Sequence, residues 1–152
     1  MSGILALFIQ SPRNNKEMKI HYVDARCFRY ATESSNKVIE AIQYLLPPET
    51  QIDRSTTEGH YGDKIEIYTA RIENADGVRH ILDTVSHLLN DDTDAEERVD
   101  EDCTFHLRID KQSAYNQEPS LGEGIDLSMK MEAYPAKKHK AVDAVEETIE
   151  KL

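Results

Sequence analysis

The stretch "IDLSMKMEA", residues 125–133, alternates apolar and polar side chains more regularly than any other part of the chain. Its apolar positions are Ile125, Leu127, Met129, Met131 and Ala133. Successive side chains of a β-strand point to opposite faces of a sheet, so this pattern predicts a strand with one buried and one exposed face. A sheet that keeps one face open to solvent is therefore expected.

Weaker patterns on the N-terminal and C-terminal sides of this stretch predict the other elements. The predicted strands span residues 20–30, 63–73, 105–110 and 125–133, and the predicted helices span 38–46, 78–89 and 135–152. This β-α-β-α-β-β-α order predicts an α+β fold with a four-stranded, mainly antiparallel sheet and three helices packed on one face. The third and fourth strands, joined by a long loop, should pair antiparallel.

A chain of 152 residues fits a single domain, which we expect to span residues 18–152. Residues 1–17 fit poorly with the pattern of the remaining chain and are predicted to be an N-terminal extension. The apolar run from Ile4 to Ile9 is far shorter than the roughly 20 residues of a membrane span. This run also lacks the basic flank of a secretion signal, so a cytoplasmic location without a membrane partner is expected.

Two cysteines, Cys27 and Cys103, lie in strand-like stretches without a partner at metal-ligand spacing. We interpret them as free core thiols of a reducing compartment. The histidines form no zinc motif either, so no metal and no cofactor are expected.

The net charge of −11 argues against a nucleic-acid ligand, because phosphate contacts require lysine and arginine. Residues 91–102, "DDTDAEERVDED", hold eight acids and one arginine, which accounts for −7 of that charge. The objection therefore applies mainly to this acidic segment, which we interpret first as a solvated loop.

The exposed face of the sheet is the natural place for a binding platform. The pattern assigns four basic residues to it, Arg26, Lys64, Arg108 and Lys130. It also assigns five acids, Asp24, Glu66, Asp110, Asp126 and Glu132. Phe28, Tyr30, Tyr68 and Tyr134 are candidates for stacking on bases, although aromatic side chains are more often buried in the core.

Between the first helix and the second strand, "TTEGHYG" at residues 56–62 places His60 and Tyr61 between two glycines. Gly59 and Gly62 indicate a backbone that needs positive φ or that a ligand approaches closely. The side chains of His60 and Tyr61 between them are expected to be exposed. The alternative is a turn whose Tyr61 folds back on the core.

The start of the last helix reverses the charge order that would stabilise it. Lys137, Lys138 and Lys140 lie in its first turn, where the positive end of the helix dipole disfavours cations. Unpaired amides and lysines together predict an anion site, although an ordinary solvated turn is an equal alternative. We expect this turn to lie beside the glycine-flanked turn, forming one pocket for a polyanion.

The segment "RIDKQSAY", residues 108–115, is interpreted as a salt-bridged strand end in which Asp110 caps the next turn of the chain. An alternative hypothesis brings Asp110 and Lys111 together with Glu58 and His60. Such a cluster suits proton transfer on phosphate esters and would make the protein an enzyme.

Four segments in this order resemble an archaeal family of RNA-binding proteins described as predicted exosome subunits. They are "TEGHYGDKI" at 57–65, "ERVDED" at 97–102, "RIDKQSAY" at 108–115 and "AYPAKKHKAV" at 133–142. The resemblance implies an α+β domain related to the ribosomal protein that binds 5S rRNA, with RNA as ligand and without established enzymatic activity. Its signature positions in this chain are Thr57, Glu58, Gly59, His60, Tyr61, Gly62, Arg108, Asp110, Lys111, Gln112, Tyr115, Tyr134, Lys137 and Lys138.

The leading hypothesis is thus a non-catalytic RNA-binding protein of archaeal RNA processing, to which Lys140 adds a further candidate RNA contact. Exosome or ribosomal proteins are the expected protein partners. Another hypothesis is an interaction module that uses residues 91–102 to bind a basic protein. A half-covered sheet also allows a homodimer.

Overall fold

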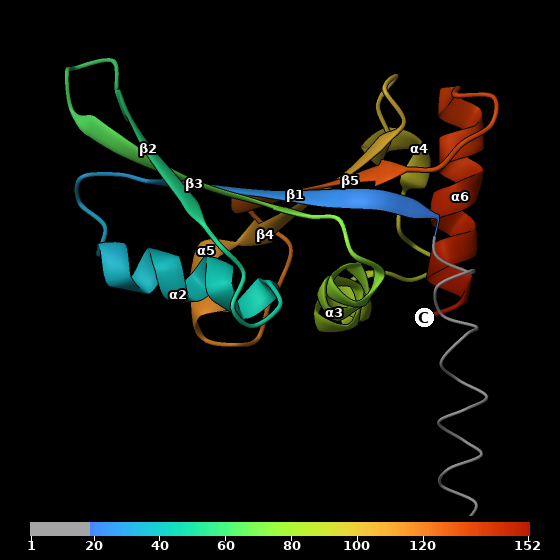
Figure 1. The fold of residues 1–152 in the computed structure, drawn as a ribbon, viewed down its shortest axis with the longest axis horizontal. Coiled ribbons are helices and arrows are strands. Elements are labelled where there is room, and N and C mark those ends of the chain that lie inside the picture. Colours follow the sequence, from blue (N-terminus) through green and yellow to red (C-terminus); the bar gives the residue numbers. More distant parts are fainter. Residues whose placement is uncertain (1–18) are drawn as a thin grey trace, which may run out of the picture.

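The computed structural model describes residues 19–152 as one antiparallel sheet with helices against it (Figure 1). The strands are β1 (Ile20–Arg29), β2 (Asp53–Glu58), β3 (Lys64–Ile72), β4 (Thr104–Asp110) and β5 (Gly124–Met131). The α-helices are α2 (Ser35–Leu45), α3 (Ala75–Val85), α4 (Ala95–Arg98), α5 (Lys111–Tyr115) and α6 (Lys138–Glu150), and a 3₁₀ helix, η1 (Ser86–Leu88), comes directly after α3. The sheet order is β2-β3-β1-β5-β4.

The predicted α+β class is confirmed, but the predicted element count is wrong. The described residues form five strands and five α-helices where four strands and three helices were expected. The missed strand, β2, has the sequence "DRSTTE" and all six of its residues are exposed. Since none of its side chains is apolar, β2 shows no alternation. It is a strand only because its backbone pairs with β3.

The antiparallel pairing expected for the last two strands is confirmed. Leu107 of β4 lies opposite Leu127 of β5, and Leu127 lies opposite Ala25 of β1 on the other side. All three of these residues are buried, which places the centre of the core under β1, β5 and β4. The regular alternation in β5 is therefore the pattern of a strand between two neighbours with one covered face.

The orientation predicted for β3 is inverted in the structure. Ile65, Ile67 and Thr69 lie on the open side of the sheet, whereas Tyr68, Ala70 and Ile72 are buried. Glu66 is consequently buried as well, at 6% exposure. It is tolerated there because Arg29, Arg54 and the Tyr68 hydroxyl all donate hydrogen bonds to its carboxylate.

Helices α2, α3 and α5 lie on one side of the sheet, and α6 stands at its end (Figure 1). Ser34 caps α2 by accepting from the Lys37 amide, and Asn74 caps α3 by accepting from the Gly77 amide. The last helix begins at Lys138 rather than at the predicted Pro135. Its residues Val142 and Val145 are buried, and Val145 lies near Ile20 at the start of β1 and Met131 at the end of β5.

The predicted extension, residues 1–17, lies outside the described residues. Within residues 19–152 both cysteines are free and buried, which confirms the prediction of core thiols. Burial raises the pKa of Cys27 to about 11. Over the same residues, no helix combines the length and apolar character that a membrane span needs.

Candidate functional site

The side of the sheet opposite α2, α3 and α5 forms a surface that we call the open face. It carries the alternate side chains of all five strands, and none of these residues is buried. They are Tyr22, Asp24, Arg26, Phe28, Asp53, Ser55, Thr57, Ile65, Ile67, Thr69, Arg71, Thr104, His106, Arg108, Asp126, Ser128 and Lys130. A hollow of about 510 Å³ lies on it between β1, β3 and β2.

The charge of the open face differs from the sequence prediction. Four basic residues, Arg26, Arg71, Arg108 and Lys130, face three acids, Asp24, Asp53 and Asp126. Because β3 is inverted, Lys64 and Glu66 move to the other side and Arg71 joins the face. Asp110 caps α5, and Glu132 lies beyond the end of β5, 3.6 Å from His21. The open face is therefore slightly basic in a chain with a net charge of −11.

Two of the acids on the open face are matched by arginines. Asp24 accepts two hydrogen bonds from Arg71, at 2.7 and 2.9 Å, and Asp126 lies 3.6 Å from Arg108. Arg26 forms no ion pair with a carboxylate of residues 19–152. Lys130 forms no such ion pair either, and its ammonium donates to the Asp102 backbone carbonyl. Among the described residues, the basic side chains of the face that lack a carboxylate partner are therefore Arg26 and Lys130.

Aromatic rings and guanidinium groups are stacked at two places on β1. Arg71 lies over the ring of Tyr22, with its guanidinium carbon 4.1 Å from the ring centroid. Arg26 lies over Phe28 at 4.8 Å. Of the other predicted stacking residues, Tyr68 is buried in the core, while Tyr30 and Tyr134 are exposed away from these pairs.

The glycine-flanked segment is the turn of a β2–β3 hairpin, and Thr57 and Glu58 belong to β2. Gly62 has φ +81°, and its amide donates to the Gly59 carbonyl at 3.0 Å. A Cβ on Gly59 would lie 3.1 Å from Ile65, so the first glycine permits a close approach. Tyr61 is 88% exposed and meets His60 edge to face, which confirms the predicted display of both rings.

The lysines at the start of α6 lie at the surface. Lys137 occupies the N-cap position without a side-chain cap hydrogen bond. Figure 1 shows the hairpin turn and the start of α6 rising at opposite ends of the sheet, so the predicted single pocket does not form. The two predicted features instead flank the open face from its two ends.

The proposed catalytic cluster is not assembled. The hairpin turn that carries His60 projects away from α5 (Figure 1). The Lys111 ammonium donates to both carboxylate oxygens of Glu33, at 2.9 and 3.0 Å, and to the Phe28 carbonyl at 2.6 Å. Partial burial raises the pKa of the Glu33 carboxyl, but the hydrogen bonds from Lys111 and from the Tyr30 amide hold it below its ordinary value. Lys111 therefore serves as a structural ion-pair partner.

Asp110 of the "RIDKQSAY" segment also has a structural role. Asp110 caps α5 by accepting from the Ser113 amide at 2.8 Å, which confirms the predicted cap. Gln112 and Tyr115 line a small cleft beside α2, on the covered side of the sheet. Arg108 alone of this segment lies on the open face as an exposed cation.

The loop after α5 depends on a glycine at position 124. Gly124 has φ +126°, and a Cβ there would lie 2.9 Å from Cε of Lys111. We expect Gly124→Ala to lower the free energy of unfolding by about 1–3 kcal/mol, because it adds backbone strain and a collision. Urea denaturation followed by circular dichroism would measure this change.

The turn glycine Gly62 supplies the matched control for this prediction. Its φ is also positive, but no atom lies within 4 Å of a Cβ built there. Asparagine tolerates left-handed backbone, so Gly62→Asn should be nearly neutral. If Gly124→Ala were as stable as Gly62→Asn, the backbone strain and the collision with Lys111 expected at position 124 would be contradicted.

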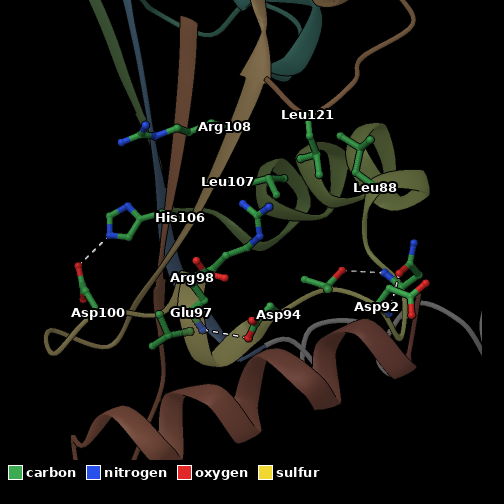
Figure 2. Close-up of a pocket in the computed structure, with 13 residues that line it drawn as sticks. Leu88, Asp92, Asp94, Glu97, Arg98, Asp100, His106, Leu107, Arg108 and Leu121 are labelled. Atoms are coloured by element: carbon green, nitrogen blue, oxygen red, sulfur yellow. Dashed lines mark hydrogen bonds and ion pairs between the residues drawn. The ribbon is translucent and has the colours of Figure 1, made fainter. Parts of the chain in front are cut away.

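The acidic segment borders a different cleft, of about 780 Å³, beside the edge strand β4. Figure 2 shows His106 and Arg108 pointing to one side of β4 and Leu107 to the other. The charged lining of this cleft consists of four acids and two arginines, Asp92, Asp94, Glu97, Asp100, Arg98 and Arg108, with His106 at its border. Partial burial raises the pKa of Asp100, but a hydrogen bond from His106 and two from backbone amides hold it below its usual range. Four carboxylates against two arginines give this cleft a net negative charge, which disfavours a polyanion.

These features define an α+β protein with a slightly basic open sheet face that carries two arginine–aromatic stacks. The family model described as "RNA binding" matches residues 22–132. The chain belongs to this RNA-binding family, which confirms the resemblance seen in its motifs.

Similar proteins occur in archaea. The RNA-binding protein PAB1135 of Pyrococcus abyssi is 35% identical over 148 residues, which cover 88% of this chain and 96% of that protein. The crystal structure of AF2318 from Archaeglobus fulgidus has a TM-score of 0.74 at 32% identity, over 85% of this chain and 99% of that one. Mth689 of Methanothermobacter thermautotrophicus also has a TM-score of 0.74, at 33% identity, over 86% of this chain and 97% of its own.

Proposed function

We propose that this protein is a non-catalytic RNA-binding protein and that RNA lies along the open face of the sheet. The observation that carries the proposal is the distribution of charge. A chain of net charge −11 keeps one face with four basic residues against three acids, and two of those acids are paired with arginines. A polyanion should bind to such a face in preference to the acid-lined cleft beside β4.

The signature residues extend this surface at its two ends. Thr57 lies on the open face at the hairpin, and the adjoining turn displays His60 and Tyr61. At the other end, the start of α6 supplies Lys137, Lys138 and Lys140, with the exposed ring of Tyr134 just before them. A strand of RNA laid along the face would meet cations in its middle and at the α6 end.

The electrostatic part of binding should be modest in size but strongly dependent on salt. About four phosphate contacts to a single strand give a slope of about −2.8 in log affinity against log salt. Affinity would then fall about fiftyfold between 50 and 200 mM salt. A neutral, purely apolar binding site would show almost no such dependence.

Charge reversal on the open face tests the proposal. The double variant Arg26→Glu/Arg108→Glu should weaken RNA binding at least tenfold and flatten the salt slope by about 0.7 for each lost contact. The triple variant Lys137→Glu/Lys138→Glu/Lys140→Glu should weaken it in the same direction. Fluorescence anisotropy of a labelled RNA, titrated at several salt concentrations, measures both quantities.

The matched control reverses two charges on other surfaces. Lys37→Glu/Lys151→Glu makes the same change in net charge, on α2 and at the end of α6. We expect this variant to bind RNA like the unaltered protein, apart from a small general effect of net charge. Equal losses in both double variants would show that the open face is not the RNA site.

The resemblance to predicted exosome subunits supports an accessory role in archaeal RNA processing. Association with exosome or ribosomal proteins and the formation of a homodimer stay predictions. So does the use of residues 91–102 to bind a basic protein.

A further inference from the structure

Two pairs of an arginine over an aromatic ring lie on the same side of the sheet along one strand. Tyr22 with Arg71 and Phe28 with Arg26 both project from the open face of β1 or from its neighbour β3. Phe28 follows Tyr22 by six positions along the strand, which corresponds to about 20 Å at the rise of a β-strand. The open face therefore offers two flat contact points along one direction.

Arg71 is positioned as a platform rather than as a phosphate ligand. Its Nε and Nη2 groups donate to the two oxygens of Asp24 at 2.7 and 2.9 Å, so the carboxylate occupies its donor edge and offsets its charge. The guanidinium lies over the Tyr22 ring, with its central carbon 4.1 Å from the ring centroid, and 51% of the side chain is exposed. A planar group held in this way is suited to stack on a nucleic-acid base.

The second pair differs in charge. Arg26 rests on Phe28 at 4.8 Å but has no carboxylate partner among the described residues. The Arg26 guanidinium can therefore stack on a base through its planar group, and its positive charge can attract a neighbouring phosphate. One neutralised and one charged platform on the same strand suit a ligand in which bases and phosphates are both accessible.

Double-stranded RNA does not match these features. A duplex keeps its bases inside and is recognised through phosphates and 2′-hydroxyls, which requires a row of cations. The open face has four basic residues, and Asp24 and Asp126 pair with two of them. Stacking contributes about 1–3 kcal/mol for each base in single-strand binding, so two platforms outweigh what the remaining cations add at physiological salt.

We infer that the ligand of the open face is single-stranded RNA, with one base stacked on the Tyr22–Arg71 pair and another on the Arg26–Phe28 pair. The inference rests on the proposed function and specifies the class of RNA. Unpaired bases in the loops of a folded RNA or at the end of a transcript would be equally suitable ligands for the two pairs.

The test compares one RNA in two forms. A single strand of about 12 nucleotides, chosen without self-complementarity and within the usual size of a single-strand site, is titrated alone and as a duplex with its complement. We expect the single strand to bind at least tenfold more tightly. Tyr22→Leu and Phe28→Leu should each weaken single-strand binding about five- to hundredfold.

Arg71→Lys provides a second variant that keeps the charge and removes the plane. Arg71 is exposed, so this change should leave the fold intact, which circular dichroism would check. We expect it to weaken single-strand binding at least fivefold with an unchanged salt slope. The control Arg98→Lys makes the same exchange in the acid-lined cleft and should have no effect.

The outcomes separate the inference from the proposed function. Equal or tighter binding of the duplex, or full binding by Tyr22→Leu, Phe28→Leu and Arg71→Lys, would overturn the single-strand inference while RNA binding stands. Failure of both RNA forms to bind at low salt would overturn the proposed function, and the inference with it.

Discussion

Replacing Leu127 by alanine should lower the free energy of unfolding by about 2–5 kcal/mol. Leu127 lies in the middle of β5, is fully buried, and faces Ala25 and Leu107 on the neighbouring strands. The substitution removes buried apolar surface and leaves a cavity, because β1 and β4 hold β5 in place on both sides. A change of this size would remove a large part of the stability of an ordinary domain.

The control for this prediction is Ile67→Ala on β3. The amino-acid pattern suggested that Ile67 faces the core, but the structure places it, only partly buried, on the open face. Ile67→Ala should therefore lower the free energy of unfolding clearly less than Leu127→Ala does. Urea denaturation monitored by circular dichroism measures both variants, and equal losses would contradict the inverted orientation of β3.

The two strands that the sequence described incorrectly share a physical cause. For β2, the residues Asp53–Glu58 bury nothing, so the strand is specified only by backbone pairing with β3. For β3, apolar residues occur on both faces, with Ile65 and Ile67 on one and Ala70 and Ile72 on the other. Tyr68, Ala70 and Ile72 enter the core, which places Glu66 on the covered side. Its partners there come from β1, β2 and β3, and no local pattern reveals them.

The candidate site was predictable in its parts but not in its arrangement. Exposure of Tyr61 and of Lys137 could be inferred from glycine spacing and from the reversed charge order of the last helix. Their separation results from the sheet order, in which β1 lies between β3 and β5. The same order brings Arg71 of β3 beside Tyr22 and Asp24 of β1, a cluster whose members lie about fifty positions apart in sequence. Only long-range pairing creates it.

The carboxylate of Glu66 links three strands of the sheet. Arg29 of β1 and Arg54 of β2 form ion pairs with it, and the Tyr68 hydroxyl donates to it at 3.1 Å. Burial by itself raises the pKa of the Glu66 carboxyl, but the hydrogen bonds from Arg29, Arg54 and Tyr68 outweigh it and hold the pKa below its ordinary value. The ionised form is therefore favoured more in the folded protein than in the unfolded chain.

This difference makes stability depend on pH in a defined direction. A glutamate has a pKa of about 4.3 in the unfolded chain, and the pKa of Glu66 is lower in the folded protein. The contribution of Glu66 is then fully present above pH about 4.3 and is lost as the pH falls through the lower, folded value. Below that value both states carry the protonated acid, and the contribution is absent.

We therefore expect Glu66→Gln to destabilise the protein strongly at pH 7, because it leaves two arginines without their shared carboxylate. The deficit relative to the unaltered protein should shrink as the pH is lowered below about 4. Urea denaturation at a series of pH values measures it, and Glu58→Gln, at the exposed end of β2, is the matched control with no such deficit. A deficit that stays constant with pH would mean that the Glu66 carboxylate is not preferentially ionised in the fold. The three-strand link would then depend on shape and hydrogen bonding alone.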